Sequence, residues 1–372
     1  MRIVVLCKRQ YTNRDVIDDR YGRLWEIPAE LAKAGHRVTC VSFSYATKDV
    51  VDKTFELGGG ASVRWISVNL GRLLIVGLVR YLATLRKILK SESPDVIWSA
   101  SDSVYTVLGR FFCRRYKCAH VADLYDNFES FAAYRLPFMG GMFRRSVIYA
   151  DGVSCVSENL RRRVVQTYGR TGNTAVITNA VDTTMFRPQD KRECRERLGL
   201  PRDAVLVGAA GDMSAQRGAD IMFQAIKEQG GELQDVHIAV AGFRNAETRI
   251  PQSDNVHDLG MLPFDDVPAL IASLDVAVVY NRASAFGDYC FPQKFYEVLA
   301  CGVPLVAANV GELGILLQQQ SELLYEDGDV GSFVQVLKAQ LERHRGLEMN
   351  IPTWRDQALL LEQQMQSVVA GS

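Results

Sequence analysis

The sequence predicts two α/β domains in tandem, each built on a doubly wound parallel sheet. Its 372 residues suffice for about two domains. Short apolar strands alternate with helices in a repeated strand–helix–strand order. This order stops at a polar, turn-rich stretch, residues 179–188, and then starts again. Apolar residues make up 48% and charged residues 23% of the chain, which excludes disorder, collagen and coiled coil.

The first half opens with a buried strand at 1–7. A helix follows at 23–34, where Leu24, Ile27 and Leu31 recur at helical spacing, and Gly35 ends it as a C-cap residue would. Ser157 is expected to cap a helix that runs to residue 168. The other expected strands are 36–43, 63–68, 95–99, 120–123 and 152–156, and the other expected helices are 73–90 and 104–115.

The second half repeats the pattern. Strands are expected at 204–209, 237–241, 276–280 and 304–308, and helices at 218–229, 267–273 and 295–300. A last amphipathic helix, 354–369, follows the break at Pro352. We therefore expect an N-terminal domain at 1–180, to which a C-terminal helix at 353–372 crosses back, and a C-terminal domain at 181–352.

Charge is unevenly distributed. Residues 1–180 contain 27 Lys and Arg against 16 Asp and Glu, and residues 181–372 contain the reverse. A basic first half indicates an anionic partner such as a membrane surface or a phosphate-bearing substrate. The alternative is that the two halves attract each other. A nucleic-acid partner is not expected, because no helix-turn-helix or aromatic sheet motif accompanies the basic residues.

Targeting and metal signals are weak. The longest apolar run, 73–79, is far shorter than the roughly 20 residues of a membrane-spanning helix, and residues 1–6 do not resemble a signal peptide. A cytoplasmic protein is expected. The eight cysteines lack a four-ligand zinc pattern, so reduced thiols and no metal site are expected.

The loops at the carboxyl ends of the strands are the places to look for a ligand. After the first strand, the loop 8–21 contains Arg14 and Arg20 and leads to Gly22, which opens a helix whose N-terminus could meet an anion. The loop lacks the G-x-G-x-x-G pattern, so a dinucleotide cofactor is not expected there.

In the second half, a strand runs into a loop from Gly211 to Gly218 and then into a helix. A flexible glycine loop, the cation of Arg217 and a helix N-terminus together indicate a diphosphate site, although Arg217 could also be an ordinary surface residue. Lys294 and Glu297 are three residues apart on one helix face. They could bind a phosphate and a sugar diol, or form a simple surface ion pair.

Taken together, these segments resemble the family-4 glycosyltransferases of the GT-B fold. The stretch Asn179-Ala-Val-Asp … Phe-Arg-Pro188 is similar to the family's interdomain N-G-V-D-x-x-x-F-x-P. The loop 211–218 is similar to G-R-L-x-x-x-K-G. The run from Pro292 to Pro304 fits P-x-K-x-x-E-x-x-A-x-G-x-P. The resemblance covers about residues 175–330 and is looser in the N-terminal half.

The resemblance implies two Rossmann-like domains facing across a cleft. It also implies transfer of a sugar from a UDP-, GDP- or dTDP-sugar with the anomeric configuration retained, without a required metal or other cofactor. Arg217 and Lys294 would stabilise the leaving diphosphate. Glu297 would bind the nucleotide ribose. The remaining donor-binding positions are Gly211, Gly218, Gly242, Phe243, Leu262 and Tyr289.

Three positions depart from the family pattern. Asp212 replaces the loop arginine, Tyr289 (beside Asp288) replaces the first glutamate of Glu-x7-Glu, and the family's histidine falls near Tyr125. Asp126 could bond a donor or acceptor hydroxyl as a catalytic residue, or simply cap the next turn. The expected acceptor side comprises Arg14, Arg20, Gly22 and Tyr125.

Two basic apolar stretches indicate a membrane contact. Leucines recur among Arg72, Arg80, Arg86, Lys87 and Lys90 in the helix 73–90, and a second stretch covers 136–145. Ordinary packing of both helices on the sheet is the alternative. The hypothesis is a hexosyltransferase of bacterial cell-surface polysaccharide biosynthesis, with a glycan or lipid-linked acceptor, peripheral at the inner membrane face.

Two other function classes remain. A GT-B nucleotide-sugar 2-epimerase would need acidic groups around the sugar, and the 175–188 motif argues against it. A non-catalytic subunit that binds a nucleotide-sugar is favoured only by Asp212 and Tyr289.

Overall fold

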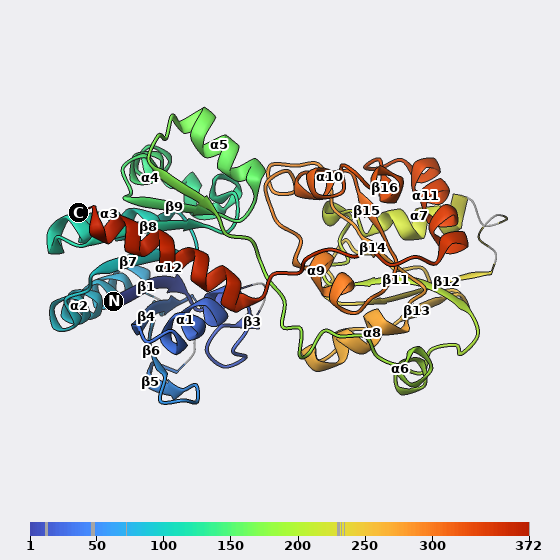
Figure 1. The fold of residues 1–372 in the computed structure, drawn as a ribbon, viewed down its shortest axis with the longest axis horizontal. Coiled ribbons are helices and arrows are strands. Elements are labelled where there is room, and N and C mark those ends of the chain that lie inside the picture. Colours follow the sequence, from blue (N-terminus) through green and yellow to red (C-terminus); the bar gives the residue numbers. More distant parts are fainter. Residues whose placement is uncertain are drawn as a thin grey trace. The chain divides into compact units, whose positions relative to one another are not determined.

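The computed structural model describes residues 1–11, 14–45, 49–71, 73–228, 231, 233 and 235–371. The chain forms two compact units. Unit 1 comprises Met1–Asn179 and Trp354–Ser372, and unit 2 comprises Ala180–Thr353. Each unit has a mainly parallel sheet with helices on both faces (Figure 1). The predicted fold class of two doubly wound α/β domains is confirmed.

The sheet of unit 1 has the strand order β10-β9-β8-β7-β1-β4-β6-β5. Neighbouring strands are parallel except β5, which runs antiparallel to β6. Val5 in β1 pairs with Cys40 of β4 on one side and with Trp98 of β7 on the other. The elements are β1 (Arg2–Lys8), β2 (Gln10–Tyr11), β3 (Arg14–Asp15), α1 (Arg23–Lys33), β4 (Arg37–Ser44), β5 (Val51–Glu56), β6 (Ser62–Asn69), α2 (Leu74–Glu92), β7 (Val96–Ala100), α3 (Ser103–Tyr116), β8 (Ala119–Leu124), α4 (Met139–Ile148), β9 (Gly152–Cys155), α5 (Glu158–Tyr168), β10 (Asn173–Val176) and α12 (Trp354–Ala370).

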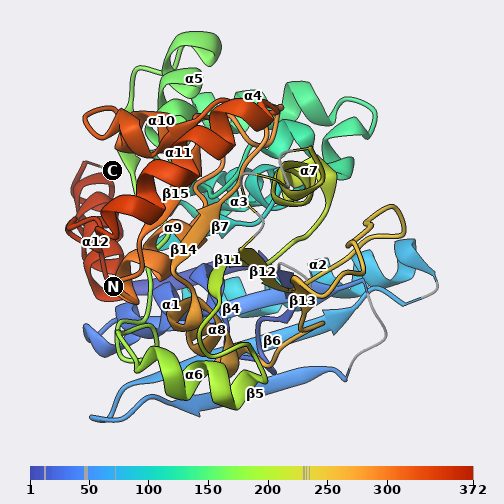
Figure 2. The same cartoon turned by 90° about the vertical axis from the view of Figure 1, so that its right-hand side faces the viewer.

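The helices of unit 1 cover both faces of its sheet. The last helix, α12, packs beside α1 on one face, and α2 and α3 cover the other (Figures 1 and 2). Buried side chains of β1, β4 and β6 meet Leu85 and Leu89 of α2 and Phe112 of α3 in one apolar cluster. Because both faces are covered, β1 is apolar at almost every position rather than alternating.

Unit 2 has the strand order β13-β12-β11-β14-β15-β16, all parallel. Helices α7 and α11 cover one face of this sheet, and α6 and α8 pack together on the other (Figures 1 and 2). The elements are α6 (Lys191–Leu198), β11 (Val205–Ala210), α7 (Asp220–Glu228), β12 (Val236–Ala241), β13 (Val256–Asp258), α8 (Val267–Ser273), β14 (Val276–Val279), α9 (Gln293–Ala300), β15 (Leu305–Ala308), α10 (Glu312–Leu316), β16 (Leu324–Tyr325) and α11 (Val330–Arg343).

Capping side chains fix where several helices begin. The hydroxyl of Ser157 accepts the N–H of Leu160 at 3.2 Å, as predicted, and Asp102 accepts the N–H of Val104 at 2.9 Å at the start of α3. Gly35 follows α1 with a φ of 89°, the conformation expected of a residue that ends a helix.

Helices α4, α6 and α11 and strands β5 and β13 are among the elements that were not predicted from the sequence. Helix α4 contains Gly140 and Gly141 and has no side-chain N-cap, so burial of Phe143 rather than helix propensity holds it. Helix α6 is short and highly charged, and only Cys194 and Arg195 are buried in it. β5 is a mostly exposed edge strand that lacks an apolar stripe.

Each sheet has one topological switch point, where the chain reverses the side on which it adds strands. In unit 1 this point lies between β1 and β7, and in unit 2 between β11 and β14. Open α/β sheets bind ligands beyond the carboxyl ends of the strands at such points. The residues that follow β11 and β14, and those that follow β1 and β7, are therefore in the two places where ligands are expected.

A buried ion pair joins the start of α1 to β8. Arg23 and Asp123 have fully buried side chains, and their two hydrogen bonds measure 2.7 and 2.9 Å. Arg23 also donates to the carbonyl oxygens of Ile177 and Thr178 at 2.8 and 2.9 Å. The guanidinium thus holds residues 177–178, near the end of the first segment of unit 1, against the sheet of that unit.

Candidate functional site

Two glycines lie close together beside the switch point of unit 2. Gly211 follows β11 with a φ of 128°, and Gly242 follows β12 with a φ of 140°. A Cβ on Gly242 would overlap the carbonyl oxygen of Gly211. The two backbone segments therefore approach too closely for any residue but glycine at position 242. The N–H of Gly211 donates to Ala241 at 2.8 Å and holds this crossing in place.

The side chain of Lys294 extends from the first turn of α9 to Gly211. Its ammonium lies 3.7 Å from the ring centroid of Tyr280, and a Cβ on Gly211 would come within 2.8 Å of its Nζ. Burial lowers the pKa of Lys294 to about 8, against the opposing charges of Glu297 and Asp212. Within the described chain no carboxylate forms an ion pair with Lys294. The simple surface ion pair with Glu297 is therefore not what the structure contains.

Asp212 stands where the resembled family has an arginine, and it organises the loop. Its Oδ1 accepts the N–H of Ser214 at 3.0 Å, and its Oδ2 lies 3.7 Å from Nε of Arg217. Tyr280 donates its hydroxyl to the carbonyl oxygen of Asp212 at 2.7 Å. Arg217 lies 3.6 Å from the ring centroid of Phe286. The loop thus keeps two cations, Arg217 and Lys294, beside one carboxylate.

Glu297 lies one turn beyond Lys294 on α9. Its side chain is buried, and its Oε1 accepts a hydrogen bond from Gln293 at 3.1 Å. Gly218, at the end of the loop, packs against the carbonyl of Asn281. The amide of Asn281 donates to Gly287 at 2.9 Å and so holds the segment that carries Tyr289, which is half-buried.

The expected donor-binding positions Gly242, Phe243 and Leu262 lie beside the same crossing. Phe243 follows Gly242 and is 40% exposed, and its carbonyl accepts the N–H of Met213 at 2.9 Å. The N–H of Gly242 donates to Gly260 at 2.8 Å, two residues before the half-buried Leu262. All predicted donor-binding residues therefore belong to unit 2 and follow β11, β12, β13 or β14, or lie on α9.

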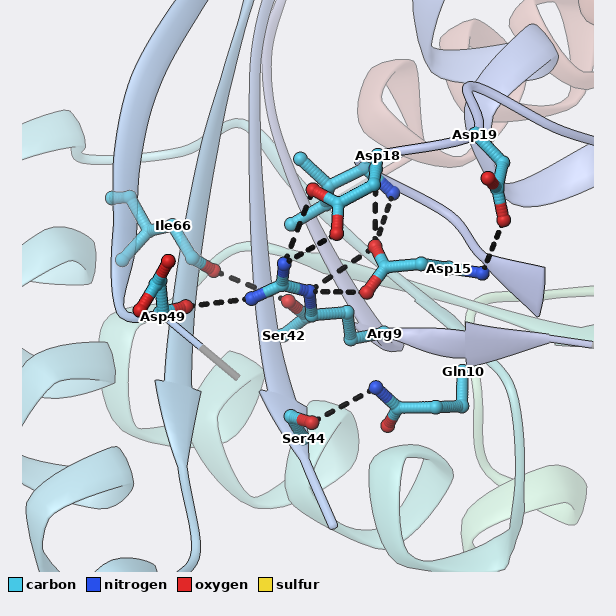
Figure 3. Close-up of polar contacts among 10 residues, drawn as sticks. Arg9, Gln10, Asp15, Asp18, Asp19, Ser42, Ser44, Asp49 and Ile66 are labelled. Carbon is cyan, nitrogen blue, oxygen red and sulfur yellow. Dashed lines mark hydrogen bonds and ion pairs between the residues drawn. The ribbon is translucent and has the colours of Figure 1, made fainter. Parts of the chain in front are cut away.

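On unit 1, a buried arginine that the sequence analysis did not select anchors the loop after β1. Arg9 is 2% exposed and pairs with Asp15 at 2.8 Å and with Asp18 at 3.2 Å (Figure 3). It also donates to the carbonyl oxygen of Asp49 at 2.7 Å. The carboxylate of Asp19 accepts the N–H of Asp15 at 2.8 Å and tightens the turn further.

The structure does not gather the predicted acceptor-side residues at one point. The guanidinium of Arg20 packs on the rings of Trp25 and Phe55, at 5.8 and 5.3 Å, beside the β5 edge of the sheet. Arg14 packs on Tyr21 at 5.0 Å, just before Gly22, which precedes α1. Tyr125 follows β8, which four strands separate from β5.

Tyr125 and Asp126 instead lie beside Lys8, the last residue of β1. The Lys8 ammonium is 5.5 Å from the ring centroid of Tyr125. Asp126 is buried, and its Oδ1 accepts the N–H of Asn127 at 2.8 Å, so the turn-capping alternative is part of what it does. Lys8 was not among the predicted site residues, although its position at the end of the first strand is where ligand-binding residues of such sheets are expected.

His120 belongs to the core and not to a site. Its Nε2 lies 2.8 Å from Oγ of Ser99, and Gly109 of α3 packs directly against its ring. Burial lowers the pKa of His120 to about 3, so it is neutral at physiological pH.

Helix α2 divides into two parts. Tyr81, Leu85 and Leu89 are buried against the sheet, whereas Ile75 and Val79 in its first turns are 79% and 61% exposed. The expected basic partners Arg80, Arg86, Lys87 and Lys90 are exposed, and Arg72 lies outside the described residues. In the second stretch Phe138 is 87% exposed. Among the described helices, none is long and apolar enough to cross a membrane.

We expect the affinity for UDP to fall as the pH rises through about 8. The free protein loses the Lys294 charge above this pH, whereas a bound diphosphate favours the charged form. Binding then takes up a proton, and affinity falls by up to about tenfold per pH unit. Calorimetric titrations between about pH 7 and 9 measure this slope. Lys294→Arg should remove it, since a guanidinium stays charged, and equal slopes in both proteins would contradict the assignment.

Comparison with known proteins matches each half of the chain to a family model of glycosyltransferases. Residues 23–185 match the family model of Glycosyltransferase Family 4, and residues 204–343 match that of Glycosyl transferases group 1. D-inositol 3-phosphate glycosyltransferase 1 of Catenulispora acidiphila is 29% identical over 179 residues, 44% of this chain and 42% of that protein. D-inositol 3-phosphate glycosyltransferase of Mycobacterium tuberculosis H37Ra is 27% identical over 198 residues, 50% of this chain and 38% of that protein. Each match thus spans less than half of these relatives.

Solved structures show the fold over the full length. Sucrose-phosphate synthase of Thermosynechococcus elongatus superposes with a TM-score of 0.76 at 15% identity and covers 100% of both chains. Anabaena HepE in complex with UDP superposes with a TM-score of 0.67 at 18% identity, over 100% of this chain and 98% of that one. HepE has also been solved with UDP-glucose.

Proposed function

We propose that this chain, whose two halves match the models of Glycosyltransferase Family 4 and Glycosyl transferases group 1 and whose fold is that of GT-B structures, is a family-4 glycosyltransferase that transfers a sugar from a nucleotide-diphosphate donor with retention of configuration. The acceptor is a glycan or a lipid-linked sugar of bacterial cell-surface polysaccharide biosynthesis. The single observation that carries the proposal is the gathering of Lys294, Arg217 and Glu297 around the crossing of Gly211 and Gly242 at the switch point of unit 2.

The donor side of this proposal follows from the chemistry of a leaving diphosphate. Transfer forms a bond between the oxygen of an acceptor hydroxyl and the anomeric carbon and breaks the bond from that carbon to the diphosphate. The diphosphate leaves with additional negative charge, and the hydroxyl proton is released as the new bond forms. Two fixed cations can stabilise that charge: among the described residues, Lys294 has no ion pair and Arg217 has only the 3.7 Å contact with Asp212. We therefore propose that Arg217 and Lys294 serve this role and that transfer proceeds without added metal. HepE structures with UDP and UDP-glucose support a nucleotide-sugar as donor.

Retention is tested directly on the product. The full chain is incubated with an α-linked donor, UDP-glucose, and a panel of sugar acceptors in the presence and absence of a chelator. Proton NMR of the new anomeric signal then reports the configuration. An α-linked product in chelator supports the proposal, and a β-linked product would contradict it. Binding of UDP without turnover of any donor would favour the non-catalytic alternative.

Glu297→Gln should weaken UDP binding by roughly 10- to 100-fold, because a buried carboxylate that accepts from ribose hydroxyls forms charge-assisted hydrogen bonds. The wild type should therefore prefer UDP over 2′-deoxy-UDP, and Glu297→Gln should lose most of this preference. Glu228→Gln on the exposed end of α7 is the control. An unchanged preference in Glu297→Gln would show that Glu297 does not contact the ribose.

The membrane part of the proposal rests on unit 1. Exposed apolar residues of α2 and of 136–142 lie among exposed basic side chains, and such surfaces bind anionic lipid. The protein should float with vesicles that contain phosphatidylglycerol and not with pure phosphatidylcholine vesicles. The double variant Ile75→Ser/Val79→Ser should reduce flotation, and a wild type that stays unbound to anionic vesicles would refute this part.

A further inference from the structure

The switch point of unit 1 carries its own cluster of charged and aromatic side chains. Lys8 ends β1, Asp102 follows β7, and Asp126 follows β8. The chain adds β4, β6 and β5 on one side of β1 and then β7, β8, β9 and β10 on the other. Lys8 and Asp102 therefore flank the point at which such sheets bind ligands.

Local contacts hold the cluster together. The backbone N–H of Lys8 donates to the hydroxyl of Ser101 at 2.8 Å, which joins the two strand ends. Oδ1 of Asp102 is occupied by the N–H groups of Val104 and Tyr105. This carboxylate is 5% exposed, so α3 and the strand end fix its position.

The ammonium of Lys8 is placed by aromatic rings and not by an ion pair. It lies 5.5 Å from the ring centroid of Tyr125 and 5.2 Å from that of Phe131. In the part of the chain that the structure describes, no carboxylate approaches its Nζ within ion-pair distance. Lys8 is half-buried. The aromatic rings position its ammonium without accepting conventional hydrogen bonds from its three N–H donors.

Charge decides which kind of ligand fits. Burial lowers the pKa of Lys8, while Asp102 and Asp126 act on it in the opposite direction. One ammonium beside two carboxylates favours groups that both donate and accept hydrogen bonds, and the two carboxylates repel a further anion. Sugar hydroxyls are such groups, and the half-buried ring of Phe131 offers an apolar surface beside them.

We propose that Lys8, Asp102 and Phe131 form the acceptor subsite and select an uncharged sugar ring, with Lys8 as the specificity-determining hydrogen-bond donor to one of its hydroxyls. This inference rests on the proposed glycosyltransferase function. It differs from the acceptor side predicted from sequence, which placed Arg14 and Arg20 there, and it disfavours a phosphorylated acceptor at this position.

The test compares Lys8→Met with a matched control, Lys53→Met. Lys53 is an exposed lysine of the same unit whose ammonium also lies over an aromatic ring, 4.9 Å from the centroid of Phe55. Saturation-transfer NMR on the full chain with UDP present measures binding of glucose, galactose and mannose and of their 6-phosphates. A calorimetric titration with UDP alone is run on each protein.

The wild type should bind at least one of the neutral sugars. It should bind none of the 6-phosphates more tightly than the corresponding neutral sugar. Lys8→Met should weaken that sugar roughly tenfold or more, with UDP affinity unchanged, and Lys53→Met should behave as the wild type. Tighter binding of the phosphates, or neutral-sugar binding that is equal in Lys8→Met, would overturn the inference. A wild type that fails to bind UDP would instead count against the donor site, so the two failures are distinguishable.

Discussion

Lys294→Met should lower kcat for turnover of UDP-glucose by about 10²- to 10³-fold, the usual effect of removing one preorganised charge from a transition state. The ammonium is held beside Gly211 and over Tyr280, where no carboxylate of the described chain pairs with it. We therefore propose that its charge acts on a bound diphosphate rather than on the fold. Release of UDP, followed by a coupled assay, gives the rate.

The same variant should leave the free energy of unfolding unchanged or raise it. Burial already lowers the pKa of Lys294 to about 8, so the charged side chain is held at a cost, and a methionine packs well on an aromatic ring. Lys227→Met, at an exposed position of α7, is the matched control for activity. Activity of Lys294→Met within about threefold of the wild type would exclude the proposed catalytic role, since one charge is expected to contribute far more.

Asp123→Leu should destabilise unit 1 by about 3–5 kcal/mol, because it leaves the fully buried guanidinium of Arg23 without its carboxylate. Ser154, which donates to the same carboxylate at 2.5 Å, loses its partner as well. All four tryptophans of the chain, Trp25, Trp65, Trp98 and Trp354, lie in unit 1. Fluorescence during urea unfolding therefore reports this unit separately from unit 2.

The double variant Arg23→Met/Asp123→Leu is the control for that prediction. Replacing both members of a buried pair by apolar residues removes the unpaired charge, so the double variant should be more stable than Asp123→Leu alone. A loss below about 1 kcal/mol in Asp123→Leu would mean that the pair contributes no more than an exposed one.

The sequence predicted the elements that carry a clear period. Strand β1 and helix α1 combine an apolar pattern with recognisable ends, and both appear close to the expected residues. Helices α4 and α6 escaped prediction because packing of a few residues, Phe143 in one case and Cys194 in the other, outweighs sequences with two glycines or with a high charge.

The donor side was easier to predict than the acceptor side. Gly211, Arg217, Lys294 and Glu297 are close in two short motifs, so their spacing alone places them on one loop and one helix face. Lys8 lies 94 residues before Asp102 and 118 before Asp126, and it meets them only through the strand order of the sheet. Spacing in the sequence could not reveal this cluster. It also could not reveal that Arg9, rather than Arg14 or Arg20, is the buried arginine of the first loop.

The most direct test of the account is a calorimetric titration of the full chain with UDP, GDP, dTDP and ADP in chelator. The account predicts that at least one of them binds without metal, and that Arg217→Ala and Glu297→Ala each weaken this binding by roughly tenfold or more. Arg202→Ala, an exposed arginine of unit 2, should bind as the wild type does. If no nucleoside diphosphate binds the wild type, with or without Mg²⁺, the switch point of unit 2 is not a donor site.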